Sequence, residues 1–347
     1  MSKRTLESFY KTVTPPKSKK LKAEAGEPEN IPTSFSHHAN YPHPIATLPP
    51  PIANPLASIK DSPSKKINNQ PQLDLLYFHP LIPTSTARDL FQFLRRELPF
   101  YRVQYTIKRG GQTTQITTPR FTTVFGVDAT SLFVPDEQDG DGSETGGADA
   151  GKTSPALKLV DANSRQPIAD NKYQYKPRPI PSCLDTLRRY VEAANNDGST
   201  YNFCLVNFYA TGDDSISYHS DDERFLGSNS SIASISLGAQ RDFLMRHKPS
   251  QQPGISNQPM KFALASGDMV VMRGETQSNW LHSIPKRKGG EAHRGRINIT
   301  FRKAVVPGGT NNYYNYNVGR GIVYRWSEGE GKMVAQVKRE TDGDGES

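Results

Sequence analysis

The chain has 347 residues, with 27 prolines, 27 glycines, 34% hydrophobic residues and a formal net charge of +8. Its length would allow two domains, but this composition favours one compact domain with long irregular flanks. The positive charge favours a polyanionic partner such as nucleic acid, although many basic proteins have none, and the lack of any run of ~20 apolar residues excludes a helical membrane protein.

The cysteine content bears on the cellular compartment. Cys183 and Cys204 are the only two cysteines, and no apolar signal-like stretch follows Lys3 and Arg4. Both features predict a reduced intracellular compartment. No feature indicates a membrane partner, and we expect a monomer.

Residues 1–70 are rich in Pro, Ser, Asn and Lys, and their apolar residues are too scattered to form a core face. We therefore predict a disordered arm. Within it, the run PPKSKKLK at 15–22 is typical of a nuclear localisation signal, with a solvated charge cluster as the alternative. The expected location of the protein is the nucleus.

The first ten residues contain a short apolar group in this polar arm. Leu6, Phe9 and Tyr10 have the spacing of a sliding-clamp-binding motif, in which one aliphatic and two aromatic side chains on a helical turn fill a pocket. Lys3 stands where the usual glutamine would be. A sliding clamp is therefore a predicted partner, with a chance match as the alternative.

We predict a folded domain over residues 71–306 that opens with two amphipathic helices. The first follows the cap cluster 84–86 and repeats apolar residues at helical spacing: Ala87, Leu90, Phe91, Leu94 and Leu98. The second starts near Pro181 and ends at the polar run 195–198. Between them, the acidic, glycine-rich residues 136–154 offer almost nothing to bury, which predicts a disordered insert.

From Tyr201 onward the pattern changes to short strands separated by turns. Six segments carry it: FCLVNFY at 203–209, SIASISL at 231–237, RDFLMRH at 241–247, KFAL at 261–264, MVVMR at 269–273 and RINITFR at 296–302. Several short strands after two helices predict an α+β fold, mainly β, with a double-stranded β-helix (jelly-roll) core and flanking N-terminal helices. Residues 307–347 form a C-terminal extension to which the sequence assigns no role.

The last predicted strand has one polar and one apolar face, because side chains alternate along a strand. The polar face holds Arg296, Asn298, Thr300 and Arg302. Two arginines would be costly in a dry core, yet they suit a cavity that binds a small dicarboxylate. The alternative is an edge strand with a solvated face.

The strand at 203–209 supports the interpretation that these polar residues line a cavity. Asn207 and Tyr209 share one of its faces and add an amide and a phenol. His219 and Asp221 follow two residues apart, and His282 lies further along the chain. Two histidines and one carboxylate can occupy one face of an octahedron, as in non-haem Fe(II) oxygenases. Taken alone, a His-x-Asp pair is more often a pair of surface residues.

The order of these pieces is more specific than any one of them. Asn-x-Tyr, His-x-Asp, a distant His and two arginines six apart follow one another in NFY, HSD, LHS and RINITFR, with SLGAQRDFLMRHK between the histidines. This order resembles the AlkB family of 2-oxoglutarate dioxygenases, in particular its branch that repairs alkylated DNA. The resemblance covers about Leu73 to Lys303 and is densest from Asn202 onward.

The resemblance implies that His219, Asp221 and His282 bind Fe(II), with 2-oxoglutarate and O2 as cosubstrates. It also implies a set of residues that hold 2-oxoglutarate: Asn207, Tyr209, Arg296, Thr300 and Arg302. The expected reaction decarboxylates 2-oxoglutarate to succinate and hydroxylates an N-alkyl group, which leaves as formaldehyde. The expected substrates are bases in DNA alkylated on the Watson–Crick edge, such as 1-methyladenine and 3-methylcytosine.

Five residues are expected to contact the damaged base. The resemblance implies this role for Asp222, Arg120, Tyr173, Gln174 and Tyr175. A guanidinium and aromatic rings could anchor a flipped base. The alternatives are a loop carboxylate bonded to backbone for the acid, and tyrosines that only pack against the domain.

One stretch departs from the family pattern. Where a duplex-repairing relative would carry an apolar wedge on a hairpin, this chain has Lys108, Arg109, Gly110 and Gly111. The choice between double and single strands is therefore open. An RNA or single-strand demethylase, a non-catalytic nucleic-acid-binding relative and a dioxygenase of protein side chains remain as alternatives, although the intact metal and arginine residues weigh against the second.

Overall fold

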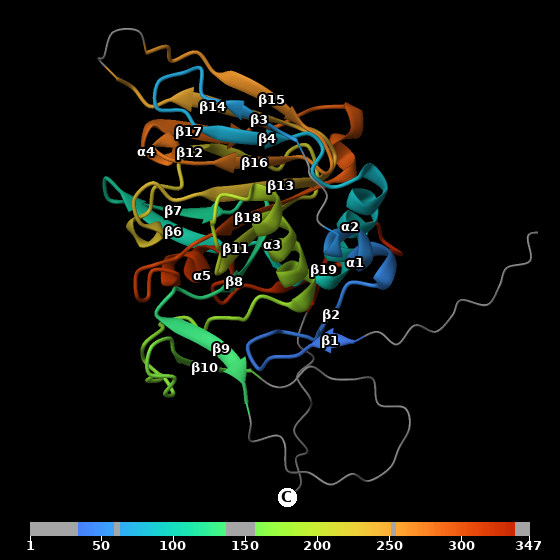
Figure 1. The fold of residues 1–347 in the computed structure, drawn as a ribbon, viewed down its shortest axis with the longest axis vertical. Helices are drawn as coiled ribbons and strands as arrows, with labels where there is room; N and C mark the ends of the chain where they lie inside the picture. The colour runs from blue at the N-terminus through green and yellow to red at the C-terminus, as the bar shows by residue number, and fades with distance from the viewer. Residues whose placement is uncertain (1–33, 59–62, 137–156, 251–254, 337–347) are drawn as a thin grey trace, which may run out of the picture. The chain divides into compact units, whose positions relative to one another are not determined.

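A computed structural model describes residues 34–58, 63–136, 157–250 and 255–336 of the protein (Figure 1). Its main feature is a ten-stranded antiparallel sheet. Across this sheet the strands run in the order β20 (Lys332–Gln336), β19 (Val323–Ser327), β5 (Phe100–Tyr101), β8 (Phe121–Gly126), β11 (Phe203–Tyr209), β18 (Arg296–Arg302), β13 (Ile232–Gly238), β16 (Met269–Met272), β4 (Leu75–Phe78) and β3 (Ser64–Ile67).

A four-stranded antiparallel sheet accompanies the large one. Its order is β12 (Ile216–His219), β17 (Trp280–Ile284), β14 (Arg241–His247) and β15 (Met260–Leu264). Three two-stranded ribbons complete the described strands: β1 (Phe35–Ser36) with β2 (Ile45–Ala46), β6 (Gln104–Arg109) with β7 (Gln112–Thr117), and β9 (Ser131–Pro135) with β10 (Leu157–Asp161).

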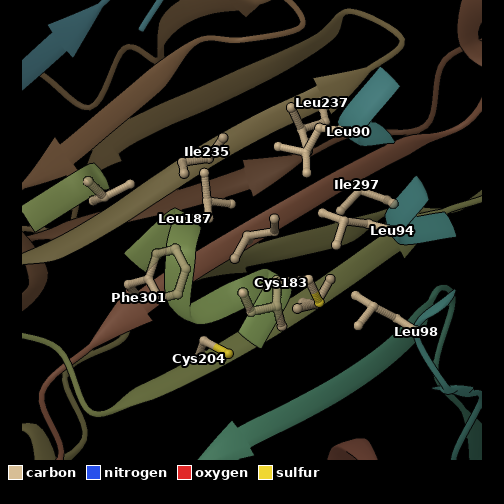
Figure 2. Packing of buried hydrophobic residues seen from close by; sticks show 14 of the residues in the cluster. Leu90, Leu94, Leu98, Cys183, Leu187, Cys204, Ile235, Leu237, Ile297 and Phe301 are labelled. Atoms are coloured by element: carbon tan, nitrogen blue, oxygen red, sulfur yellow. The ribbon is translucent and has the colours of Figure 1, made fainter. Parts of the chain in front are cut away.

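The three longest described helices, α1, α2 and α3, cover one face of the large sheet. The helices of the described residues are α1 (Pro50–Ala57), α2 (Thr84–Glu97), α3 (Ser182–Asn195), the short α4 (Thr276–Asn279) and α5 (Asn311–Asn317). Figure 2 shows the apolar residues of α2 and α3, among them Leu90, Leu94 and Leu187, packed against Ile235 and Ile297 of the central strands. The predicted helices near Ala87 and Pro181 are confirmed as α2 and α3.

A second core lies on the opposite face of the large sheet. Leu205 of β11 and Ile232 of β13 pack there with Phe243 and Met245 of the small sheet. The two sheets therefore face each other, with helices behind the larger one. This confirms the predicted mainly β, α+β class and agrees with a double-stranded β-helix core. None of the described helices is long and apolar enough to cross a membrane.

The prediction of a disordered arm over residues 1–70 is wrong for the described part of that segment. There the chain forms β1, β2, α1 and β3. Ile45, Ile52 and Leu56 are almost fully buried in the main core, and the Tyr41 hydroxyl donates to the Pro179 carbonyl at 2.7 Å. These apolar residues show no periodicity because each short element buries only one or two of them; α1, for example, docks on α2 and α3.

The boundary predicted at residue 306 is also wrong. After β18 the chain continues into α5, and β19 then pairs with β5, so that the extension belongs to the large sheet. Tyr314 is 2% exposed, and the Arg95 guanidinium lies 3.6 Å from the centre of the Trp326 ring. Tyr313, Tyr314 and Trp326 of the extension therefore pack against the folded domain, whereas Tyr316 is exposed.

Three sequence predictions concern residues that lie wholly or mostly outside the described part of the chain. The clamp motif at Leu6, Phe9 and Tyr10 and the basic run at 15–22 lie outside the described residues, as does nearly all of the predicted insert at 136–154. The strands on either side of that insert, β9 and β10, pair with each other, with Pro135 opposite Leu157. β9 and β10 therefore form an antiparallel pair.

Candidate metal and cosubstrate site

The three predicted metal ligands come together between the two sheets. His219 ends β12 and lies directly opposite His282 of β17 in the antiparallel register, and Asp221 follows two residues after His219, just beyond the strand. One ligand atom from each of the three lies within 4.8 Å of the others. The imidazole rings are 4.2 Å apart, and His282 Nε2 is 3.8 Å from Asp221 Oδ2. This spacing fits a single metal ion.

Hydrogen bonds orient the triad. Nδ1 of His219 lies 2.9 Å from the Ser217 carbonyl, which can only accept, so Nδ1 carries the proton and Nε2 keeps a lone pair for a metal. Asp221 Oδ2 accepts from Arg302 Nη2 at 2.9 Å, and the Asp221 backbone N–H donates to Gln277 at 2.9 Å. Asp221 is therefore held through its carboxylate by Arg302 and through its backbone by Gln277.

The same surroundings favour the protonation states that bind metal. Burial lowers the pKa of His282 to about 3, and the His219 ring adds to this effect, so the imidazole is neutral at physiological pH. Burial acts to raise the pKa of Asp221, but Arg302 and both histidines outweigh it and hold that pKa below its ordinary value. A neutral imidazole and an ionised carboxylate are the forms that ligate a divalent cation.

The predicted polar face of β18 lines the same cavity, which has a volume of about 600 Å³. β18 lies between β11 and β13 in the middle of the large sheet, so the edge-strand alternative is wrong. In the β11–β18 register Asn207 lies opposite Asn298 and Tyr209 opposite Arg296. The two neighbouring strands thus present a continuous polar wall to the cavity.

Arg296 carries donors that no described residue satisfies. The side chain is 1% exposed, and Nη2 donates to Ser236 at 2.8 Å, whereas Nε and Nη1 have no hydrogen-bond partner among the described residues. Burial lowers the pKa of Arg296 to about 10, which still leaves it charged. A buried guanidinium with unpaired donors is costly unless an anion binds it. The residue therefore fits a carboxylate ligand in the cavity.

Residues 74–302 match the sequence model of a protein family, the 2OG-Fe(II) oxygenase superfamily. The chain belongs to this superfamily. Membership implies Fe(II), 2-oxoglutarate and O2, and the residues fit them: the triad offers the donor set of a facial metal site, and Arg296 offers unpaired donors for a carboxylate of 2-oxoglutarate.

Several curated relatives are similar to this superfamily member. Human "DNA oxidative demethylase ALKBH2" is 40% identical over 132 residues, which are 38% of this chain and 49% of the relative. Rat "Alpha-ketoglutarate-dependent dioxygenase alkB homolog 3" is 37% identical over 155 residues, 43% of this chain and 51% of the relative. The chain thus spans about half the length of these relatives. Both bear out the resemblance to the AlkB family.

Among solved structures, the chain matches one titled "The structure of OsALKBH1". The identity is 18% and the TM-score 0.37, over 70% of this chain and 100% of that chain. The assignment to the superfamily therefore comes from the profile match, and the fold from the two sheets themselves.

Two of the five predicted base contacts lie near the cavity, in different environments. Arg120 lines the cavity, and its Nε donates to Asn207 Oδ1 at 2.6 Å. Asp222 does not line it; this carboxylate points outward and pairs with Lys248 at 2.6 Å. Consecutive side chains of an extended segment point to opposite sides, so the side chain that shares the cavity with Asp221 is Glu223.

The YQY segment is not brought to the cavity. The Tyr173 ring is buried, and its hydroxyl donates to Asp128 at 2.9 Å. Gln174 is exposed, and the Tyr175 hydroxyl donates to Asn315 at 2.7 Å. None of the three residues lines the cavity. Their contacts match the packing alternative for both tyrosines.

The structure adds cavity residues that the sequence reading missed. Those with polar or aromatic side chains include Tyr105, Glu223, Arg224, Asn312, Tyr313 and Tyr316. Glu223 could have been found because it continues the HSDDE run. The residues of α5 carry no such signal, since they stand among asparagines in a segment without apolar periodicity.

Proposed function

We propose that this chain is an Fe(II)- and 2-oxoglutarate-dependent dioxygenase that removes N-alkyl groups from nucleobases. One observation carries the proposal: a single cavity of about 600 Å³ holds both the His-Asp-His triad and the unpaired guanidinium of Arg296. A volume of this order accommodates a small cosubstrate together with a flat base.

Different residues of the chain would hold the metal, the cosubstrate and the substrate. Bound Fe(II) with 2-oxoglutarate would supply the oxidation that hydroxylates the alkyl carbon next to the ring nitrogen. His219, Asp221 and His282 would hold the metal, and Arg296 would bind a cosubstrate carboxylate through its free Nε and Nη1. Asn207 orients Arg120 at the cavity wall, where a guanidinium can contact a base or its phosphate.

Nucleic acid as the substrate is supported by the name of one relative and by two aromatic residues that line the cavity. Human ALKBH2 is called a DNA oxidative demethylase, which gives the chemistry of that protein. In this chain, Tyr105 of β6 and Tyr316 of α5 line the cavity and meet edge to face with ring centres 5.4 Å apart. Aromatic rings at an opening can stack on an unpaired base.

The test is a product assay on oligonucleotides that contain 1-methyladenine or 3-methylcytosine. The full chain, Fe(II) and 2-oxoglutarate should give formaldehyde, succinate and an oligonucleotide lighter by one methylene in stoichiometric amounts. His219→Ala, Asp221→Ala and His282→Ala should each abolish turnover and keep the circular dichroism spectrum. Intact lesions after incubation with the wild-type chain, or normal rates in any of the three variants, would refute the proposal.

We further propose single-stranded or locally opened nucleic acid as the preferred substrate. The β6–β7 hairpin tip supports this, because Gly110 and Gly111 have φ values of +53° and +78°, as in a tight two-residue turn. Such a tip carries no side chain to replace a flipped base in the stack. RNA is then a second candidate substrate with the same chemistry, and the same assay on methylated RNA compares the two.

Two proposals rest on the sequence alone. We propose a nuclear location from the basic run at 15–22 and docking to a sliding clamp through Leu6, Phe9 and Tyr10. Replacing Phe9 and Tyr10 by alanine should abolish co-purification with the clamp and leave turnover on free oligonucleotides unchanged. Equal capture by wild type and variant would remove the second proposal.

A further inference from the structure

The C-terminal extension reaches the metal site through one residue of α5. Figure 1 shows α5 beside β8 and β11. The Tyr313 ring packs in the core between the sheets, with its centre 5.4 Å from the rings of both Phe203 and Phe225. These edge-to-face contacts fix the ring, and hence the direction in which its hydroxyl points.

The Tyr313 hydroxyl connects two charged groups of the cavity. It donates to Glu223 Oε1 at 2.8 Å and accepts a hydrogen bond from Arg302 Nη1. The other terminal nitrogen of the same guanidinium, Nη2, donates to the metal ligand Asp221 at 2.9 Å. A continuous chain of hydrogen bonds therefore runs from Glu223 through Tyr313 and Arg302 to Asp221.

This chain determines how Arg302 can lie. The side chain is 2% exposed, and its Nε has no hydrogen-bond partner among the described residues. Its two terminal nitrogens each have one acceptor, the Tyr313 phenol and the Asp221 carboxylate. Because both terminal nitrogens of the planar guanidinium are hydrogen-bonded, the group cannot rotate without breaking one of these bonds. Loss of the phenol would leave it attached at Asp221 alone.

We infer that Tyr313 is a positioning residue of the metal site, which fixes Arg302 against Asp221 and thereby sets the orientation of the metal-binding carboxylate. The inference rests on the proposed function only in requiring that the triad binds a divalent metal. Partners of metal ligands commonly change metal affinity by about 10- to 100-fold when they are removed. Residues 307–336 are then part of the active site and not an appendage to it.

The adjacent residue provides a matched control. Tyr314 is also buried in α5, but its hydroxyl donates to the Gly126 carbonyl at 2.8 Å and accepts from the Arg178 backbone N–H at 2.8 Å. Neither partner lines the cavity. Tyr313→Phe and Tyr314→Phe therefore each remove one buried phenolic hydroxyl from the same helix, and only the first breaks the connection to Asp221.

The experiment measures Mn(II) binding to the full-length chain by calorimetry, without substrate, together with the melting temperature. Both variants should lose similar stability, but Tyr313→Phe should raise the Kd for Mn(II) by about 10-fold, whereas Tyr314→Phe should change it by less than about 2-fold. Equal Kd values for wild type and Tyr313→Phe, or an equal rise in both variants, would overturn the inference. A wild-type chain that binds no Mn(II) would instead refute the proposed function.

A second pair of variants leaves Tyr313 unchanged, in case its replacement prevents folding. Glu223→Gln and Glu223→Ala both remove the charge, but the glutamine oxygen can still accept from the phenol. The Kd for Mn(II) should therefore be several-fold higher in Glu223→Ala than in Glu223→Gln, on the order of 3-fold or more. Equal Kd values in the two variants would contradict the positioning role.

Discussion

Arg296 and Arg302 lie on the same face of β18, but their partners differ. Arg302 is paired with Asp221 and Tyr313, whereas Arg296 keeps two donors without a partner among the described residues. The sequence predicted both as equal ligands of 2-oxoglutarate, because alternation places residues on a face but does not show which neighbours already occupy their donors.

The first prediction is that Arg296→Lys raises the apparent KM for 2-oxoglutarate by about 10-fold or more, because lysine keeps the charge and loses the fork of two donors. The KM for the methylated oligonucleotide should change by less than about 2-fold. Arg189→Lys, on the exposed surface of α3, provides the control. Equal increases in both KM values would show that Arg296 acts on the nucleic acid.

A second prediction concerns acid stability of the metal-free protein. Burial lowers the pKa of His282 to about 3, whereas its ordinary value is 6.5. Between these values the unfolded chain binds a proton that the folded chain does not, so the free energy of unfolding decreases as the pH falls, by at most about 1.4 kcal/mol per pH unit. Burial also lowers the pKa values of His38 and His43, which act in the same direction.

Urea unfolding of the metal-free chain, measured between about pH 7 and about pH 5, tests this dependence. His282→Gln should be less sensitive to acid than wild type, with the remaining slope due to His38 and His43. A variant slope as steep as that of the wild type would show that His282 titrates normally in the fold.

At the scale of elements, the β6–β7 hairpin determines the third prediction. A missing wedge means that the enzyme depends on spontaneous opening of the damaged pair, which costs a few kcal/mol in an intact duplex and less at a lesion. The kcat/KM should therefore be at least about 10-fold higher on single-stranded than on double-stranded oligonucleotides at one salt concentration. Faster repair of the duplex would show that another residue supplies the wedge.

The hairpin also shows where a wedge can be introduced. Gly110 and Gly111 have open space around them, but their positive φ angles disfavour any other L-residue. Gln112 is exposed next to the turn and has an ordinary strand conformation. Gln112→Phe should therefore reduce the ratio of kcat/KM on single-stranded to kcat/KM on double-stranded oligonucleotides, and Gln112→Leu should reduce this ratio less. If neither variant changes this ratio, the hairpin tip does not determine the strand preference.

Elements with regular patterns were predictable from the sequence, and elements that depend on distant partners were not. β11 and β18 were predicted to the residue, because each combines alternation with chemically distinctive side chains. α1 was missed because it contains prolines and buries only Ile52 and Leu56, against helices formed elsewhere in the chain. The metal triad was found from residue order, whereas Tyr313 depends on a helix that has no apolar period.

At the scale of the whole molecule, the described parts of both flanks belong to the folded domain. α1 packs on α2 and α3, and β19 and β20 extend the large sheet beyond β5. The predicted boundaries failed because they followed composition, which describes a segment's own residues and not the surface that receives it.

The fourth prediction follows from this organisation. Ending the chain at residue 306 removes Tyr313 and Tyr314, whose burial contributes about 1.5–3 kcal/mol each, and leaves β5 without its neighbour β19. The truncated protein should lose cooperative thermal unfolding by circular dichroism. Ile322→Ala, at a side chain 54% exposed in the same segment, should shift stability by less than about 0.5 kcal/mol. A cooperative transition near the wild-type temperature would mean that the extension is dispensable.

The direct pairing of His219 with His282 has a consequence for how metal enters and leaves. β12 is an edge strand of the small sheet, held on one side only by β17, and its register shifts between Ile216 and His219. One histidine therefore sits on the strand that frays most readily. A bound ion would join the two strands as a removable cross-link, so metal exchange should follow the opening rate of this edge rather than the much slower unfolding of the domain.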